Sequence, residues 1–313
     1  MLTQELIAKF QAADGIRIGV DRMVIGYTLG PMQLAAKKAH KDSPLVQEQY
    51  SNAYISMMNE MQDTIRTVTE YKELPGKYQT RYVVRSTLSG SRLCTVSFGF
   101  GKSTYTNVEW NPSKLSHADW LELEALFDVL FELGYGGLFQ NGVVSHAEFC
   151  VDVSGAKNSD FVLVNQGRHQ KTIFNGTTYY GRRTSPLVCT MYDKGAQLKI
   201  DDDLLRVEVR INRRDIWFQD LINVGIQNPF ESIFVVPVDA LQIISNDYNK
   251  PTLANNIKEF GVSGAVKNNA ARKAILAKLK VHTVSWWQPD MFWKTHQQLL
   301  KEFRPPFVGG CNI

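Results

Sequence analysis

Cysteine is scarce in this chain. The 313 residues include four cysteines, at positions Cys94, Cys150, Cys189 and Cys311, and no two of them form a Cys-x-x-Cys pair. Zinc ribbons and small secreted disulfide scaffolds depend on closely spaced cysteines. The cysteine pattern therefore argues against both classes.

Long apolar runs are missing as well. No stretch approaches the ~20 consecutive apolar residues of a membrane-spanning helix, and the opening residues MLTQELIAKF contain no apolar core of a signal peptide. The composition is 44% hydrophobic and 21% charged, with 22 Gly and 11 Pro, which excludes fibrous and wholly disordered classes. We expect a soluble cytoplasmic protein with no membrane partner.

Charge is distributed unevenly along the chain. The net charge is only +4. Between Lys250 and Arg304, however, ten Lys and Arg residues stand against three acidic residues, a local charge of +7; the preceding 249 residues hold the other 25 basic and 28 acidic residues, a local charge of −3. A basic C-terminal region indicates a polyanionic partner, although a solvated helical surface is the simpler interpretation.

Short runs rich in β-branched and aromatic residues, bounded by Gly, Ser and Asn, predict strands. They cover residues 16–28, 80–88, 91–100, 105–110, 144–153, 171–183, 187–193 and 204–212. Helices are predicted at 44–70, 265–279 and 289–303, and from a Ser116 cap, with Asp119 at the third helical position, to Gly134. This order predicts an α+β fold with a mainly antiparallel sheet. We expect a catalytic body over 1–245 and a basic helical region, for DNA binding or an accessory role, over 246–313.

Three predicted strands carry reactive groups on one face, because successive side chains alternate across a sheet. These faces hold His146, Glu148, Cys150 and Asp152 in the first strand, Arg206, Glu208 and Arg210 in the second, and Thr190 and Tyr192, followed by Asp193 and Lys194, in the third. If the strands are neighbours, a phenol, carboxylates, an imidazole and guanidinium groups come together.

That combination suits metal-assisted phosphoryl transfer by a tyrosine. Tyr192 is the candidate nucleophile. Positive charge for the phosphodiester oxygens would come from Lys194, Arg206, Arg210 and a divalent cation, Mg²⁺ or Mn²⁺. The candidate ligands of that cation are Glu148, Asp152, Glu208 and His146, because hard cations prefer oxygen donors.

Each of these residues also has a simpler interpretation. A tyrosine near a strand end is usually a packing residue, and strand carboxylates beside arginines commonly form cross-strand ion pairs. Glu148 and Asp152 are also about 13 Å apart along a regular strand, too far to chelate one ion together. His146 or Glu148 paired with Glu208 from another strand is the easier geometry.

The order of the motifs resembles the replication initiators of rolling-circle plasmids and filamentous phages, and most of all the replication-initiation-factor (Rep_trans) family. The matching segments are HAEFCVDV with Glu148 and Asp152, the hairpin Tyr179–Gly181–Ser185, Tyr192–Asp193–Lys194, and Arg206–Glu208–Arg210; upstream, VEWNPSKLS also resembles phage members. The resemblance spans about residues 105–215.

The resemblance implies an RRM-like or ferredoxin-like initiator endonuclease core and a site-specific DNA nickase. Tyr192 would attack one strand at the origin and stay joined to the 5′-phosphate, and the released 3′-hydroxyl would prime a host polymerase. Because the chain has no GxxxxGK[ST] loop, unwinding would need a host helicase. The implied DNA is single-stranded or supercoiled origin DNA, in a bacterial host cell, and the protein is a possible homodimer.

The chain departs from the family pattern at two points. No two of the six histidines are two residues apart, so the His-hydrophobic-His metal motif of the wider initiator class is absent; the Rep_trans group manages without it. Glu148 also stands where aspartate is more usual. Tyr179 and Tyr180 are rival nucleophiles, Tyr180 being the second choice.

Basic residues outside this motif series are the candidate DNA contacts. They are Arg182 and Arg183 in the hairpin turn, and Lys267, Arg272, Lys273 and Lys278 in the C-terminal region. Trp286 and Trp287 would either stack on unpaired bases or pack in a helical core.

Two other functions remain open. A non-catalytic DNA-binding regulator would bind DNA without cleaving it. A relaxase or transposase would use the same phosphotyrosine chemistry on a different DNA target. An RRM-type RNA-binding module would present aromatic residues on the strand faces that are charged here.

Overall fold

The computed structural model describes residues 15–27, 69–73, 80–98, 106–130, 136–137, 142–167, 169, 171–212, 216–223 and 225–302. The chain divides into two compact units. Unit 1 takes residues 1–19, 148–212 and 227–299, and unit 2 takes residues 20–147, 213–226 and 300–313. The functional boundary predicted at residue 245, between the catalytic body and the basic helical region, stays a prediction.

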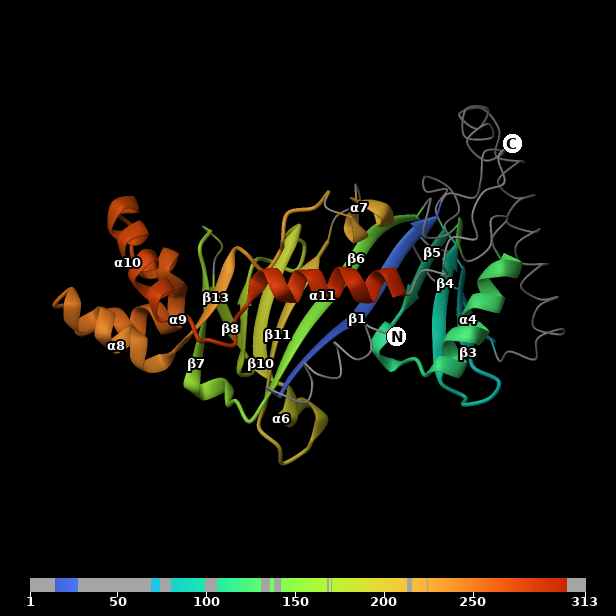
Figure 1. Ribbon diagram of the computed structural model, residues 1–313, viewed down its shortest axis with the longest axis horizontal. Helices are drawn as coiled ribbons and strands as arrows, with labels where there is room; N and C mark the ends of the chain where they lie inside the picture. The colour runs from blue at the N-terminus through green and yellow to red at the C-terminus, as the bar shows by residue number, and fades with distance from the viewer. Residues whose placement is uncertain are drawn as a thin grey trace. The chain divides into compact units, whose positions relative to one another are not determined.

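Figure 1 shows the elements along the chain. The strands are β1 (Ile16–Tyr27), β2 (Thr69–Glu73), β3 (Thr80–Arg85), β4 (Arg92–Phe98), β5 (Thr106–Trp110), β6 (Gly142–Ser154), β7 (Phe161–Asn165), β8 (Lys171–Phe174), β9 (Thr177–Tyr180), β10 (Leu187–Asp193), β11 (Leu204–Ile211), β12 (Ile216–Trp217) and β13 (Ile233–Pro237). The helices are α4 (His117–Leu130), α6 (Lys194–Leu198), α7 (Phe218–Ile222), α8 (Val238–Asp247), α9 (Leu253–Ala265), α10 (Asn269–Val281) and α11 (Pro289–Glu302), with 3₁₀ turns η1 (Pro112–Lys114) and η2 (Asn158–Asp160).

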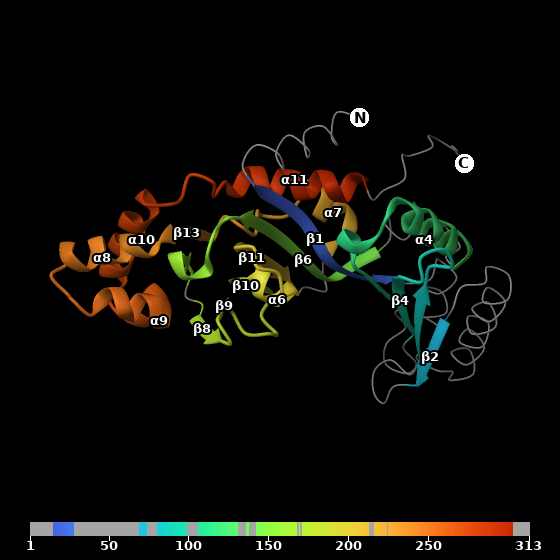
Figure 2. The ribbon, with the colours of Figure 1, turned by 90° about the horizontal axis from the view of Figure 1, so that it is seen from below.

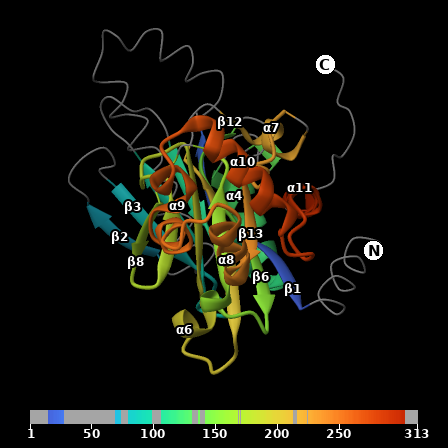
Figure 3. The same ribbon diagram turned by 90° about the vertical axis from the view of Figure 1, so that its left-hand side faces the viewer.

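The predicted fold class is confirmed. In unit 2 the strands follow the order β2-β3-β4-β5-β1, and in unit 1 the order β1-β6-β11-β10-β9-β8, with β13 and β7 forming a separate two-stranded sheet. The registers between neighbouring strands are antiparallel in both units, as for β10 with β11 and β2 with β3. Figure 3 shows β2 beside β3. The molecule is therefore α+β with an antiparallel sheet.

Helix α4 begins with the predicted cap. Ser116 Oγ accepts a hydrogen bond from the Asp119 amide at 3.2 Å, and Asp119 Oδ2 accepts one from the Ser116 amide at 3.0 Å. The other oxygen, Oδ1, accepts from the hydroxyls of Ser89 and Ser91 at 2.8 and 3.0 Å. Burial alone would raise the pKa of Asp119, but these donors outweigh it and hold the pKa well below its usual range. The carboxylate thus joins the start of α4 to the loop before β4.

Replacing Asp119 by alanine is expected to lower the free energy of unfolding by about 2 kcal/mol, because it removes a reciprocal cap and leaves three hydroxyls without their acceptor. Urea denaturation measures the loss. Asp119→Asn keeps one acceptor oxygen and should lose less; equal losses in the two variants would contradict this account.

In unit 1, helix α11 is fixed to the sheet by a buried histidine. His296 is fully buried; its Nδ1 lies 2.8 Å from the Phe292 carbonyl oxygen and its Nε2 lies 3.1 and 3.2 Å from those of Gly19 and Cys150. Burial lowers the pKa of His296 to about 4. A neutral ring donates from only one of its two nitrogens, and the Nε2 side of the ring lies against backbone oxygens of β1 and β6.

Helices α8, α9 and α10 gather at one end of unit 1 (Figure 2). Helix α9 contains a break at Gly261, whose φ of +68° favours glycine. A Cβ at this position would lie 2.8 Å from the Tyr180 hydroxyl. Glycine therefore allows α9 to lie directly against β8 and β9.

The structure differs from the predicted elements in three places. The strand expected over 171–183 is the hairpin β8–β9, because Asn175 and Gly176 both have positive φ and form its turn. Of the helix expected over 44–70, residues 44–68 lie outside the described residues, and the last two belong to β2. The helix expected from residue 265 begins at 269, where the Asn268 side chain caps it.

Trp287 belongs to the core rather than to a base-stacking surface. It is 5% exposed, and its Nε1 donates to the Ile233 carbonyl oxygen at 3.1 Å. Trp286 packs edge-on against Phe161 and Trp287.

Among the described residues, no helix is long and apolar enough to cross a membrane.

Candidate active site

Four of the reactive groups predicted from the sequence, Thr190, Tyr192, Arg206 and Glu208, share one face of the unit 1 sheet. Strands β10 and β11 pair Tyr192 with Arg206 and Thr190 with Glu208. Directly opposed residues in an antiparallel pair point to the same face. The alternate residues of β11, such as Val207 and Val209, are fully buried on the other face. The predicted alternation of β11 is therefore confirmed.

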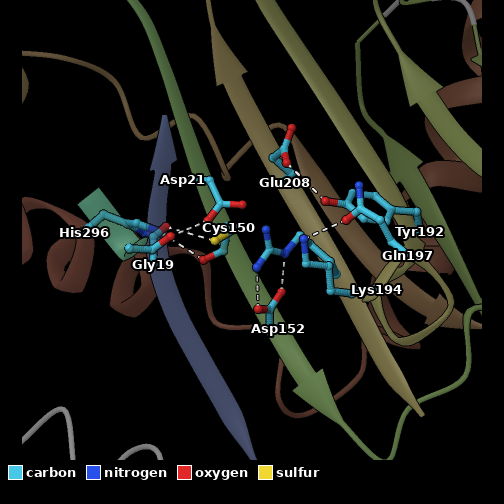
Figure 4. Close-up of polar contacts among 11 residues, drawn as sticks. Gly19, Asp21, Cys150, Asp152, Tyr192, Lys194, Gln197, Glu208 and His296 are labelled. Atoms are coloured by element: carbon cyan, nitrogen blue, oxygen red, sulfur yellow. Dashed lines mark hydrogen bonds and ion pairs between the residues drawn. The ribbon is translucent and has the colours of Figure 1, made fainter. Parts of the chain in front are cut away.

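Tyr192 points toward Glu208 across the strand pair (Figure 4). The Tyr192 hydroxyl donates a hydrogen bond to Glu208 Oε2 at 3.4 Å. Glu208 is 6% exposed, whereas Tyr192 is half-buried. A carboxylate that accepts from a phenol is placed to take its proton.

Lys194 lies next to this pair, at the start of helix α6. Asp193 caps α6 by accepting a hydrogen bond from the Ala196 amide at 2.8 Å. The cap sets Lys194 with its Nζ 6.0 Å from the centre of the Tyr192 ring, where it donates to Gln197 at 2.6 Å. A cation is thus held beside the phenol.

Asp152 and Arg206 form a buried ion pair. Arg206 donates from Nε and Nη2 to the two carboxylate oxygens of Asp152, at 2.5 and 2.6 Å. The two side chains are 9% and 7% exposed. This bidentate geometry uses both oxygens of Asp152. The pair connects β6 to β11 below Tyr192.

Arg210 lies between two further carboxylates. Its Nε is 2.8 Å from Glu148 Oε1, and its Nη2 is 3.2 Å from Glu208 Oε1. The structure therefore brings Glu148 and Glu208 together, which the sequence favoured as the easier pairing. It does so through a guanidinium group.

The net charge of this face indicates whether it could bind the predicted divalent cation. Glu148, Asp152 and Glu208 carry three negative charges against two on Arg206 and Arg210, a net −1 that Lys194 brings to zero. A phosphodiester is an anion, so such a face favours it only after taking up more positive charge. The carboxylate oxygens of Glu148 and Glu208 are of the kind that Mg²⁺ and Mn²⁺ accept.

No group of three or more His, Cys, Asp and Glu side chains is arranged to hold a metal ion among the residues described. Two protein carboxylates, completed by water and substrate oxygens, are nevertheless a usual set for Mg²⁺. Glu148 and Glu208 fit that set. Asp152 does not complete this set, because both of its oxygens accept hydrogen bonds from Arg206. His146 belongs to unit 2.

Two residues clarify the choice of nucleophile. Tyr180 is 3% exposed, and its hydroxyl donates to the Leu163 carbonyl oxygen at 3.1 Å; burial raises its pKa further. It faces away from Glu208, because it pairs with Cys189. Tyr179 pairs with Thr190 and shares the face of Tyr192. Tyr180 is thus the poorer of the two rivals.

Sequence reasoning gave no role to Thr190, although it placed this residue on the face of Tyr192. Its side chain is 2% exposed, and its Oγ1 finds no hydrogen-bond partner among the described residues. It stands opposite Glu208 on one side and Tyr179 on the other. A buried hydroxyl of this kind is available to a ligand or a water molecule.

The predicted DNA contacts differ in exposure. Arg182, Arg183, Lys267 and Lys273 are exposed, Arg272 is half-buried, and Lys278 forms an ion pair with Asp247 at 2.8 Å. Their role in DNA binding stays a prediction.

Comparison with known proteins finds a likeness among solved structures. No protein-family model matches the chain, and a search of curated proteins finds no match. Among solved structures, the chain is similar to the rolling-circle replication initiator protein from Geobacillus stearothermophilus, at 15% identity and a TM-score of 0.39, over 93% of this chain and 97% of that one. At this identity and TM-score the likeness assigns no residue a role.

Proposed function

We propose that the chain is a rolling-circle replication initiator that nicks one DNA strand with Tyr192. The observation that carries this proposal is the contact between the Tyr192 hydroxyl and Glu208 Oε2, beside charged side chains on β6 and β11. The order of sequence motifs supports the same chemistry. The protein would act in a bacterial host cell with the host's helicase and polymerase.

The proposed reaction is a transesterification. Glu208 accepts the proton of Tyr192 as the phenol oxygen bonds to the phosphorus. The bond from phosphorus to the 3′-oxygen breaks, and that oxygen leaves as a hydroxyl after taking a proton from water. The products are a 5′-phosphotyrosine and a free 3′-hydroxyl. The reverse reaction rejoins a strand.

Positive charge must balance the negative charge that develops on the phosphate oxygens. The Lys194 Nζ lies 6.0 Å from the centre of the Tyr192 ring, and Arg210 donates a hydrogen bond to Glu208 Oε1. A divalent cation held by Glu148 and Glu208 would act as a Lewis acid on the phosphate when bound. Arg206 holds Asp152 and thereby fixes β11 against β6.

The helix α10 provides a surface for DNA away from the scissile bond. A three-residue turn, 266–268, separates α9 from α10, an arrangement seen in helix-turn-helix proteins. Residues 260–289 contain five Lys and Arg and no acidic residue. Exposed alanines at 270, 274 and 277 leave room for close approach to a DNA groove beside Lys273.

We expect the double variant Lys267→Gln/Lys273→Gln to bind duplex DNA more weakly at every sequence, and to reduce the slope of log K against log salt by about 2, because each phosphate contact contributes about one unit. Fluorescence anisotropy over a salt series measures both. Lys294→Gln removes an exposed charge from α11 and is the control. An unchanged slope in the double variant would exclude α10 as a phosphate contact.

Trapping of the covalent intermediate tests the proposed function directly. The full chain is incubated with single-stranded or supercoiled circular DNA of its own replicon and Mn²⁺, denatured, digested, and analysed by mass spectrometry. We expect a nucleotide attached to Tyr192, and none when the cation is chelated. Binding without any adduct would favour the non-catalytic regulator, and an adduct on mobile-element ends but not on an origin would favour a relaxase or transposase.

A further inference from the structure

The two arginines of the site are held very differently. Arg206 makes two aligned hydrogen bonds to Asp152, and its side chain is 7% exposed. Arg210 makes one hydrogen bond to Glu208, at 3.2 Å, and its side chain is 25% exposed. Its Nε lies 2.8 Å from Glu148 without the alignment of a hydrogen bond. Arg210 is therefore the more easily displaced of the two.

The position of the Arg210 guanidinium is the one that a divalent cation would take. It lies between oxygens of Glu148 and Glu208, which come from neighbouring strands. A single positive charge there leaves the two carboxylates with a net charge of −1, whereas a divalent cation neutralises both. The unpartnered Thr190 hydroxyl, directly opposite Glu208, is a further polar group for an incoming hydrated ion.

We propose that Arg210 occupies the cation position in the free protein and exchanges with the divalent cation when the site is loaded. The inference rests on the proposed function, because it concerns the cation of that reaction. Glu208 is divided between two tasks: its Oε1 faces Arg210, and its Oε2 faces Tyr192. The exchange takes place at Oε1 and leaves the contact with Tyr192 in place.

The exchange gives Arg210 two positions with different roles. Before loading, its charge keeps Glu148 and Glu208 from repelling each other across neighbouring strands. After loading, the guanidinium is released on the same face, where a phosphodiester oxygen is its natural partner. Binding of a divalent cation by Glu148 and Glu208 would add two positive charges to the face, and the charge of Arg210 would become available to the phosphate.

Binding of Mn²⁺ to the full chain without DNA tests the exchange, with the free ion followed by electron paramagnetic resonance. Arg210→Gln removes the competing charge and is expected to bind Mn²⁺ at least about tenfold more tightly than the wild type. A tenfold change in affinity corresponds to a small part of the Coulomb energy between two charges at contact distance. Arg210→Lys keeps the charge but cannot contact both carboxylates at once, so we expect a gain of about threefold.

Lys194→Gln is the matched control. It removes the same charge from the same face, but Lys194 contacts Gln197 and neither carboxylate. An equal increase in Mn²⁺ affinity in Arg210→Gln and Lys194→Gln would show that any lost positive charge on this face has the same effect, and would overturn the exchange. Unchanged or weaker Mn²⁺ binding by Arg210→Gln, or no measurable binding by it, would also overturn it. If that variant fails to fold, as thermal melting would reveal, Arg210→Lys decides in the same way.

These outcomes are separate from those of the trapping experiment. Adduct formation by the wild type, without tighter Mn²⁺ binding in Arg210→Gln, would leave the proposed function standing and reject the exchange. Tighter binding in the variant, without an adduct in the wild type, would support the exchange at a cation site of another function.

Discussion

The variant Tyr192→Phe is expected to form no covalent adduct and to nick DNA slower than the wild type by a factor on the order of 10³ or more, because it lacks the attacking oxygen. The ring remains, so packing against β11 and affinity for DNA should hardly change. A denaturing gel measures the adduct, and relaxation of supercoiled DNA measures nicking.

Tyr179→Phe is the control for this prediction. Tyr179 lies on the same face, opposite Thr190, and the substitution removes the same atom. We expect its nicking rate to stay within about threefold of the wild type, since its hydroxyl has no role in the proposed transfer. An adduct that persists in Tyr192→Phe and disappears in Tyr179→Phe would exchange the roles of the two tyrosines.

Loss of Asp152 is expected to cost about 3–5 kcal/mol of the free energy of unfolding, because Asp152→Ala leaves the charge of Arg206 buried without its partner. The pair is bidentate, and both side chains are less than a tenth exposed. Urea denaturation measures the loss. Arg206→Met should cost a similar amount, for the reverse reason.

The double variant Asp152→Leu/Arg206→Met distinguishes a structural pair from a metal ligand. Replacing both partners by apolar residues removes the buried charges together, so we expect most of the lost stability to return, leaving a deficit of about 1–2 kcal/mol. A stable Asp152→Ala variant that has lost Mn²⁺-dependent nicking would instead assign Asp152 to the cation, as the sequence suggested.

Local patterns predicted the strands that build the site. The alternation in LLRVEVRI and the short run LVCTMYD are β11 and β10 as expected, and the Ser116–Asp119 pair begins α4 as its spacing indicated. These features depend on residues a few positions apart. The hairpin turn at Asn175–Gly176 was missed, because a single strand was expected over 171–183, although Asn-Gly is a strong turn signal.

The ion-pair partners of the charged residues could not be predicted from local sequence patterns. Arg206 and Arg210 are four residues apart on one face, yet one holds Asp152 and the other divides its contacts between Glu148 and Glu208. That choice depends on the register of β6 against β11, which no spacing within either strand reveals. Burial of Tyr180 similarly depends on α9, more than 70 residues later in the sequence.

The histidine that links α11 to β1 has a consequence for synthesis of the chain on the ribosome. His296 contacts backbone atoms 277 and 146 positions earlier, at Gly19 and Cys150. These contacts cannot form until His296 has been synthesised and has left the exit tunnel, so β1 and β6 lack this contact while the intervening residues are made. Contacts between such distant residues slow folding, because a long loop must close first. Helix α11 is the last of the described unit 1 helices to be synthesised, and it completes the packing of unit 1 at this point.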